Sequence, residues 1–325
     1  ELSRSGDAVK NSLESTAALP AQRLSTGELV FRPCWPGFGT RRYYITGGKP
    51  REAAFKGAGA EGSELWTGDS ATSRGIKLRV DDKTGAIASL VHDGRELVGK
   101  GAPAALNDYA YLPGSDVKGL QGSGPVKISV KERGPLIASL LIESDAPGCN
   151  KLTREIRVHA LRNYVEILNV VDKKAVRAKE GVHFGFAFNV PGGEMRMDVP
   201  WAVVRPEADQ IPSACKNWLT VQRWVDISGP SAGVTWLTPD APLVQVGGIT
   251  ANLIGSLSDP KRWLDRLEPS QTLYSWAMNN HWHTNYRAEQ EGPVVFRYAI
   301  RPHGGYSPAE AARFGAEASV PLLVA

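Results

Sequence analysis

The residue types best suited to chemistry gather between Met278 and Gly292. Within eight positions stand three asparagines, two histidines, two aromatic residues and a threonine, reading Asn-Asn-His-Trp-His-Thr-Asn-Tyr. Amides and imidazoles supply hydrogen-bond donors and acceptors together, which suits them to backbone groups or sugar hydroxyls. Two interpretations stay open: a polar loop that satisfies its own backbone, or a lip beside a carbohydrate site. The candidate binding residues are Asn279, Asn280, His281, Trp282, Thr284 and Asn285.

His281 and His283 form a His-x-His pair, whose rings would point to one side of a strand. Such a pair ligates a metal only with a further ligand, and none stands close by in the sequence. We therefore expect hydrogen-bonded rings and no metal site in this chain. A second charged cluster, Arg177-Ala-Lys-Glu180, precedes a phenylalanine-rich strand. Arg177 and Glu180 join the candidate binding residues, although a solvated ion-pair network is the plainer interpretation.

Catalytic groups are not assigned. Two carboxylates flanking a glycosidic bond would make a glycosidase, but the sequence does not say which two lie close together. The phosphate-binding loop, the Gly-x-Ser-x-Gly elbow and the His-Glu-x-x-His zinc helix are absent from the sequence. Nine tryptophans are many for this length; exposed rings would stack on sugars, and buried rings would belong to the core.

Length and composition exclude several classes of protein. The 325 residues, 42% of them hydrophobic, are enough for a large core. Lys and Arg total 38 against 34 Asp and Glu, and they are scattered, so we expect no nucleic-acid partner. No apolar run approaches a membrane span or a signal peptide, so no membrane partner is expected. Three distant cysteines leave the compartment open.

The elements that would position the candidate residues are mainly short strands separated by turns. Residues 75–80 alternate apolar and polar side chains, an Asp-Asp-Lys-Thr-Gly turn follows, and the mainly apolar residues 87–91 return, which predicts a hairpin. Further strands are predicted at 126–132, 136–142, 152–158, 164–170, 182–188, 219–227, 234–237, 243–246, 273–277 and 294–300. This pattern predicts an all-β fold, a large antiparallel sandwich bigger than an immunoglobulin domain.

Helix is expected only near the two ends. Val9, Leu13 and Ala17 recur at four-residue spacing, which predicts a helix over residues 8–19. Residues 49–62 have the Gly- and Ala-rich composition of a linker, so we divide the chain into an N-terminal extension, 1–62, and a main domain, 63–325. Ser307-Pro-Ala-Glu310 fits a capping box that begins a helix over residues 309–318, and residues 320–324 form a possible closing strand.

Several segments resemble the C-terminal β-domain region of glycoside hydrolase family 38, the α-mannosidases. They are the hairpin of residues 75–96 with its Thr-Gly turn, and residues 164–188 with an Asn-x-x-Asp-Lys turn and a Lys-Glu-x-x-x-Phe-x-Phe strand. Residues 278–292 are similar to the family's Asn-Asn-x-Trp-x-Thr-Asn segment, and residues 38–45 to the strand closing a small preceding β-domain. The resemblance implies a galactose-mutarotase-like supersandwich with a short helical and strand extension at its N-terminus.

The resemblance also implies what this chain lacks. Family members hold a catalytic zinc in an N-terminal domain through a His-x-Asp pair, a nucleophilic Asp and a further His, and no His-x-Asp occurs here. We therefore expect the zinc in a separate catalytic domain, with that domain and a mannoside substrate as partners. The chain begins at Glu rather than Met, which suits a piece of something longer.

Three functions are carried forward. The first is the supporting and carbohydrate-binding β-sandwich part of an α-mannosidase-like hydrolase in carbohydrate metabolism, inactive when alone. The second is a stand-alone carbohydrate-binding or structural module. The third is an independent mutarotase-like or lyase enzyme that uses histidine and carboxylate chemistry. Fold by itself does not separate them; an upstream region containing His-x-Asp would favour the first.

Overall fold

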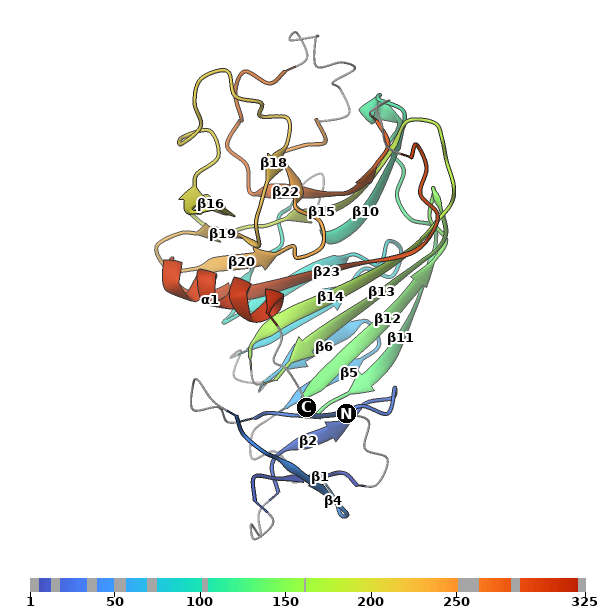
Figure 1. Ribbon diagram of the computed structural model, residues 1–325, viewed down its shortest axis with the longest axis vertical. Coiled ribbons are helices and arrows are strands. Elements are labelled where there is room, and N and C mark those ends of the chain that lie inside the picture. The colour runs from blue at the N-terminus through green and yellow to red at the C-terminus, as the bar shows by residue number, and fades with distance from the viewer. Residues whose placement is uncertain are drawn as a thin grey trace.

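The computed structural model describes residues 6–12, 18–33, 40–49, 57–68, 75–100, 105–160, 162–250, 263–281 and 287–320. Within these ranges the strands form two large sheets and two small strand pairs (Figure 1). Every strand pairing is antiparallel in the large sheets, from the β5–β6 hairpin (Ala58–Glu61 and Glu64–Thr67) to the last long strand, β23 (Gly292–His303). The two large sheets stack as a sandwich, and the small pairs lie at its lower end in Figure 1.

The larger sheet has the order β18-β21-β22-β15-β10-β8-β7-β6-β5, with β9 paired to β8. Besides β5 and β6, its strands are β7 (Ile76–Val80), β8 (Ile87–His92), β9 (Arg95–Glu96), β10 (Leu106–Pro113), β15 (Glu180–Ala187), β18 (Leu219–Thr220), β21 (Leu243–Val246) and β22 (Thr272–Asn279). A short 3-10 turn, η1 (Val117–Gly119), follows β10.

The smaller sheet has the order β11-β12-β13-β14-β23-β20-β19-β16-β17. Its strands other than β23 are β11 (Val126–Arg133), β12 (Ile137–Ser144), β13 (Cys149–His159), β14 (Tyr164–Lys173), β16 (Glu194–Val199), β17 (Ala202–Val204), β19 (Trp224–Ser228) and β20 (Gly233–Leu237).

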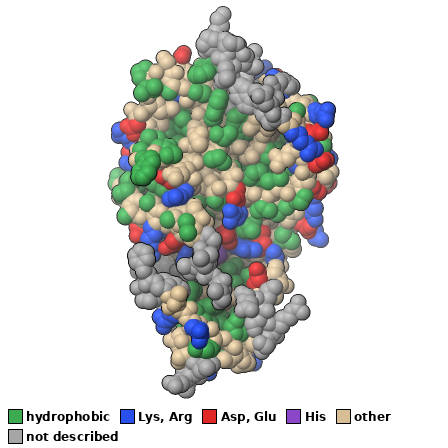
Figure 2. Space-filling model, viewed as in Figure 1, with side chains coloured by type: hydrophobic (Ala, Val, Ile, Leu, Met, Phe, Trp, Pro, Cys, Tyr) green, Lys and Arg blue, Asp and Glu red, His purple; other side chains and the backbone are tan. Residues whose placement is uncertain are grey.

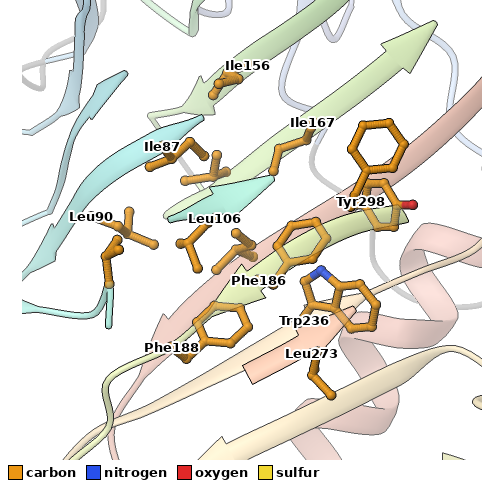
Figure 3. Close-up of a cluster of buried hydrophobic side chains, with 14 of the residues drawn as sticks. Ile87, Leu90, Leu106, Ile156, Ile167, Phe186, Phe188, Trp236, Leu273 and Tyr298 are labelled. Atoms are coloured by element: carbon orange, nitrogen blue, oxygen red, sulfur yellow. The ribbon is translucent and has the colours of Figure 1, made fainter. Parts of the chain in front are cut away.

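A continuous apolar core fills the space between the sheets. In β14 every second residue is buried, from Val165 to Lys173, as expected for a strand with one face on a core. Figure 3 shows Phe186 of the larger sheet against Trp236 and Tyr298 of the smaller one, with the Phe186 and Trp236 ring centroids 5.0 Å apart. Large rings from both inner faces thus supply much of the buried apolar area that stabilises the sandwich.

The predicted all-β supersandwich is confirmed, with two corrections to its strands. The β7–β8 hairpin pairs as expected, with Ile76 opposite His92. The single strand predicted at 219–227 is wrong, because β18 belongs to the larger sheet and β19 to the smaller one. Between them Val221 donates to the carbonyl of Pro242, and the chain crosses from one sheet to the other. Residues 58–61 of the predicted linker form β5, where Gly59 leaves room for the Trp66 ring.

The helix predicted over residues 8–19 is wrong in the part that the structure describes. Residues 8–10 form β1 (Ala8–Lys10), which pairs with β4 (Tyr44–Thr46). Val9 lies opposite Ile45 on one side and bridges to Leu19 on the other. Strand partners on both sides satisfy the backbone and bury Val9 completely, which outweighs a weak helical period. The extension therefore contributes strands, and the division of the chain at residue 62 stays a prediction.

A second small pair docks the N-terminal part onto the sandwich. β2 (Ala21–Arg23) pairs with β3 (Leu29–Phe31). The Gln22 side chain accepts from the backbone N–H groups of Leu136 and Ile137 at 2.8 Å each and donates to the Ile137 carbonyl at 2.9 Å. Gln22 is 5% exposed, so these bonds are shielded from water and fix the pair against β12.

The predicted C-terminal helix is confirmed as α1 (Pro308–Ser319). Ser307 is its N-cap and accepts from the backbone N–H of Glu310, with Pro308 at the first helical position. Phe314 of α1 packs with Trp224 and Leu237 on the outer face of the smaller sheet. No described helix is long and apolar enough to cross a membrane. The closing strand predicted at 320–324 falls largely outside the described residues.

Candidate functional site

The described candidate residues lie at one end of the sandwich, where the chain passes between the sheets. β14 of the smaller sheet ends at Lys173, and β15 of the larger sheet begins at Glu180. Lys173 pairs with Gly292 of β23, and Gly181 with Asn279 of β22. These strand ends meet on the right of Figure 1. We call residues 173–181, 279–281 and 287–292 the lip.

Asn280 ties the two connections of the lip together. Its Oδ1 accepts from the backbone N–H of Glu180 at 2.6 Å. Its Nδ2 donates to the carbonyl oxygens of Val176 at 2.8 Å and Ala288 at 3.2 Å. The residue is 8% exposed, so an unmade bond would be costly. Both amide protons are therefore used within the protein, and Asn280 positions the lip.

A buried ion pair lies beneath the lip. Lys173 Nζ stands 2.6 Å from Glu180 Oε1, and the two side chains are 2% and 6% exposed. Tyr111 of β10 donates its hydroxyl proton to Glu180 Oε2 at 2.7 Å. Burial, reinforced by the Glu180 carboxylate, raises the pKa of Tyr111 above its ordinary value, so this hydroxyl stays a donor. The network joins β10 and β15 of one sheet to β14 of the other.

The rim of the lip is exposed and charged. Arg177, with its side chain 80% exposed, binds Glu289 through Nε and Nη2 at 3.0 and 3.2 Å. Arg287 lies 3.8 Å from Glu289 and 3.2 Å from Glu291. The hydrogen bond from Arg177 lowers the pKa of Glu289. The two-pronged geometry orients both groups, while exposure to water keeps their contribution to stability small. The Arg177 and Arg287 side chains are therefore accessible to a partner.

His281 lies against the outer face of the larger sheet rather than on the rim. Its ring centroid is 6.0 Å from that of Trp276, and Trp276 stacks on His183 at 6.1 Å with the planes 3° apart. Burial, with the nearby Lys179 charge, lowers the pKa of His281 to about 4; burial also lowers the pKa of His183 to about 3. Both imidazoles are therefore neutral at pH 7. Within the part of the chain that the structure describes, neither ring nitrogen of His183 makes a well-formed hydrogen bond.

A small cavity of about 130 Å³ opens at the lip. Lys173, Glu180, Met278, Asn279, Arg287 and Glu289 contribute to its lining. Pockets that enclose a small-molecule ligand have volumes of about 300–1,000 Å³. The cavity is therefore of a size to receive a side chain of a partner rather than to enclose a sugar.

The structure brings the side chains of four predicted binding residues together at the lip, namely Asn279, Asn280, Arg177 and Glu180, whereas the His281 ring packs by Trp276. Trp282, Thr284 and Asn285 lie outside the described residues. Sequence reasoning did not single out Lys173, Tyr111 or Glu289. Lys173 stands in the Asn-x-x-Asp-Lys motif, which could have drawn attention to it. Tyr111 and Glu289 gave no signal, because their partners come from distant parts of the chain.

Metal binding depends on the donor groups that the fold gathers. Within the described ranges, no three or more His, Cys, Asp or Glu side chains are placed to hold a metal ion. The zinc implied for whole family 38 enzymes therefore has no fitting donor set in the described part of this chain.

A protein-family match covers part of the lip. The model for "Glycosyl hydrolases family 38 C-terminal domain" matches residues 73–241, more than half of the chain. The chain belongs to this family. The matched part of this family 38 domain runs from just before β7 to just beyond β20, so it contains Lys173, Arg177 and Glu180 of the lip. Asn280 lies beyond it.

Solved structures resemble this family 38 domain in fold. An α-mannosidase from Enterococcus faecalis V583 superposes with a TM-score of 0.59 at 14% identity, over 86% of this chain and 33% of that one. A family 38 glycosyl hydrolase from Enterococcus faecalis gives 0.57 at 14% identity, over 86% and 35%. The chain thus spans about a third of the length of each. A galactose 1-epimerase from Lactobacillus acidophilus NCFM gives 0.43 at 7% identity, over 75% and 95%. No curated protein sequence matches.

Proposed function

We propose that this family 38 domain is the supporting C-terminal part of an α-mannosidase-type glycoside hydrolase in carbohydrate metabolism. The observation that supports the proposal most is coverage, since 86% of this chain aligns with only 33% of an α-mannosidase chain. Most of such an enzyme is therefore built from other segments. A catalytic domain elsewhere in the protein would hold the zinc and the mannoside, and this domain would hold that catalytic domain in place.

The lip is the proposed docking edge. Arg177 and Arg287 stand exposed at its rim and are oriented by Glu289, which gives a partner fixed hydrogen-bonding groups. Behind the rim, Asn280 and the buried Lys173–Glu180 pair hold both connections rigid. The cavity of about 130 Å³ between them suits one inserted side chain. A rigid, charged edge with a small socket positions a neighbouring domain more readily than it encloses a sugar.

The test uses hydrolysis of an aryl α-mannoside. This chain alone, with or without zinc, is expected to give no turnover above a heat-denatured control. A polypeptide that joins it to an upstream family 38 catalytic region of the same gene is expected to hydrolyse the substrate. Turnover by this chain alone would instead support the independent enzyme.

The docking edge is tested separately by reversing one charge. In the joined polypeptide, Arg177→Glu places two carboxylates together at the rim, so we expect weaker domain association and faster limited proteolysis between the domains. The matched control is Arg95→Glu, an exposed arginine that contacts Ser231 away from the lip. If both substitutions have the same effect, the lip is not the docking edge.

A further inference from the structure

A groove distinct from the lip lies at the opposite end of β14. It is open to solvent and has a volume of about 680 Å³ between the N-terminal part and the sandwich, which is within the range of small-molecule sites. Tyr164 contributes to it, whereas the lip starts at Lys173, and the length of β14 between them is roughly 30 Å. Figure 2 shows basic and acidic side chains gathered along the boundary between the sandwich and the smaller part below it.

The floor of the groove is the outer face of the smaller sheet. His159 of β13 pairs with Tyr164 of β14, and their rings stack with centroids 4.4 Å apart. Arg301 of β23 also lines the groove, with its guanidinium carbon 4.9 Å from the ring centroid of Phe314. Phe314 belongs to α1, so the helix forms one wall, and residues 30–33 at the end of β3 form the other. A cleft between two parts of a fold is a common place for a ligand.

The lining is basic. Arg32, Arg162, Arg301 and Arg313 line the groove, and Glu317 is the carboxylate among its described lining residues. Glu317 is shared, with Arg162 Nη1 3.0 Å from Oε2 and Arg313 Nε 3.1 Å from Oε1. These two arginine side chains remain 59% and 67% exposed. Arg313 Nη1 also lies 3.7 Å from Glu310 Oε1. Two carboxylates thus hold the two guanidinium groups beside the groove, and several of their N–H donors stay available to a further acceptor.

Arg301 gives an independent sign that an anion belongs here. Its side chain is 19% exposed, and its Nε is buried without a hydrogen-bond partner among the described residues. Nη2 donates to the carbonyl oxygen of Glu310 at 3.1 Å, while Nη1 lies 3.5 Å from the Glu310 carboxylate. A largely buried guanidinium with an unsatisfied N–H and a long ion-pair contact is costly. Nε itself is not reachable from the groove, but each Nη uses one of its two N–H groups on Glu310, so an oxyanion in the groove would accept the remaining N–H groups and add counter-charge.

We propose that this groove binds a monosaccharide-sized acid through its carboxylate or phosphate group. Guanidinium groups present several N–H donors in a planar fork that matches such oxyanions. Arg301 on the floor and Arg162 and Arg313 on the wall are the donors, and Tyr164 and Phe314 supply apolar surface for the rest of the ligand. The site does not depend on the docking function proposed for the lip.

The test is calorimetric titration of this chain at low ionic strength with glucose 6-phosphate, glucuronate and glucose. Saturable binding of one or both acids, and none of glucose, is expected; comparison of the two acids shows whether phosphate or carboxylate is preferred. Arg162→Gln and Arg313→Gln should each weaken binding about tenfold, the usual effect of removing one charge-assisted hydrogen bond. Both positions are exposed, so the variants should keep the far-UV circular dichroism spectrum of the unchanged protein.

Arg95→Gln is the matched control, because Arg95 is an exposed arginine that contacts Ser231, away from both the groove and the lip. It should bind the acids as the unchanged protein does. The proposal is overturned if neither acid binds saturably, if glucose binds equally well, or if Arg95→Gln weakens binding as much as the groove variants. Unchanged affinity in a folded double variant, Arg162→Gln with Arg313→Gln, would also overturn it.

Discussion

Lys173 and Glu180 form an ion pair across the connection between the two sheets, with Nζ 2.6 Å from Oε1. Lys173 is the last residue of β14 and Glu180 is the first residue of β15, so the six residues between them connect the smaller sheet to the larger one. Lys173 Nζ also donates to the Lys174 carbonyl at 2.7 Å. Ions this deeply buried are tolerated only while each has its partners. The pair therefore couples the crossover to the packing of the core.

The first prediction is that Glu180→Gln lowers the free energy of unfolding by about 3 kcal/mol. The substitution keeps the shape of the side chain but leaves the Lys173 ammonium buried without a counter-charge. Urea unfolding followed by circular dichroism measures the loss.

Two further variants isolate the cause. Replacing both partners, Lys173→Met with Glu180→Leu, should recover most of the lost stability, because no ion is then left unpaired. Arg177→Gln breaks an exposed pair and should change stability by about 0.5 kcal/mol or less. If the double variant is no more stable than Glu180→Gln, the unpaired charge is not the reason for the loss.

The second prediction is that Asn280→Ala lowers the free energy of unfolding by about 2–3 kcal/mol. It removes the amide that bonds Glu180, Val176 and Ala288 and leaves those backbone groups without it. The preceding residue is the natural control: Asn279 is only half-buried and lines the cavity, so Asn279→Ala should cost about 0.5 kcal/mol or less. Equal losses in the two variants would contradict a positioning role for Asn280.

Most strands were readable from the sequence, whether one face or both were buried, but β10 was not. The alternation in β7 and the turn that follows it predicted the β7–β8 pairing, because one face of β7 meets the core and the other meets water. β15 and β20, which are buried on both faces, were readable as short runs rich in apolar residues. β10 carries no such alternation. Its residues are mostly buried on both faces, and a bulge at Asn107, with φ of 61°, shifts the register between Leu106 and Asp108. A bulge breaks a period of two, so β10 gave no pattern to detect.

Prediction of the candidate site from the sequence was limited by contacts between distant segments. Residue type alone suggested Asn280 and Arg177, because amides and guanidinium groups need partners when the fold constrains them. Their partners, Val176 and Glu289, were not inferable, since each contact joins segments about a hundred residues apart. The basic groove was likewise hidden, because its arginines come from four separate parts of the chain and gather only when β3, β14, β23 and α1 are in place.

The third prediction concerns the β16–β17 hairpin. Val199 pairs with Ala202, and Pro200 and Trp201 make the turn. Trp201 is fully exposed and has φ of 67°. Proline followed by a residue of positive φ is the pattern of a type II turn, in which glycine is preferred at the second position. Trp201→Gly should therefore raise the free energy of unfolding by about 0.5–1 kcal/mol. Removing the Cβ relieves strain in the folded state, and the greater conformational entropy of glycine in the unfolded chain cancels part of that gain.

Trp201→Ala is the comparison that isolates the backbone effect. It removes the exposed ring but keeps the Cβ, so its stability should stay within about 0.5 kcal/mol of the unchanged protein. Thermal unfolding of the three proteins gives the result. If Ala and Gly stabilise to the same degree, the ring and not the backbone conformation is responsible.

The fourth prediction is a loss of stability on mild acidification caused by His183. The unfolded chain has an ordinary histidine pKa of 6.5 at this position, whereas burial lowers the pKa in the folded protein to about 3. Below pH 6.5 the unfolded state therefore binds a proton that the folded state does not, so stability falls as the pH decreases from 6.5 towards 3. At pH 5 the loss due to His183 should be about 2 kcal/mol.

His183→Leu removes this titration while keeping a side chain of similar bulk against Trp276. Urea unfolding of both proteins at pH 7.5 and pH 5 gives the difference between their free energies of unfolding. Carboxylates titrate in both proteins and cancel in the comparison. His281, whose pKa is also lowered to about 4 by burial, titrates in both as well, and its charge is a secondary cause of the lowered His183 pKa that the comparison includes. On acidification, the free energy of unfolding of the unchanged protein should fall by about 2 kcal/mol more than that of the variant. A difference that stays constant between the two pH values would show that His183 is protonated as readily in the folded protein as in the unfolded chain.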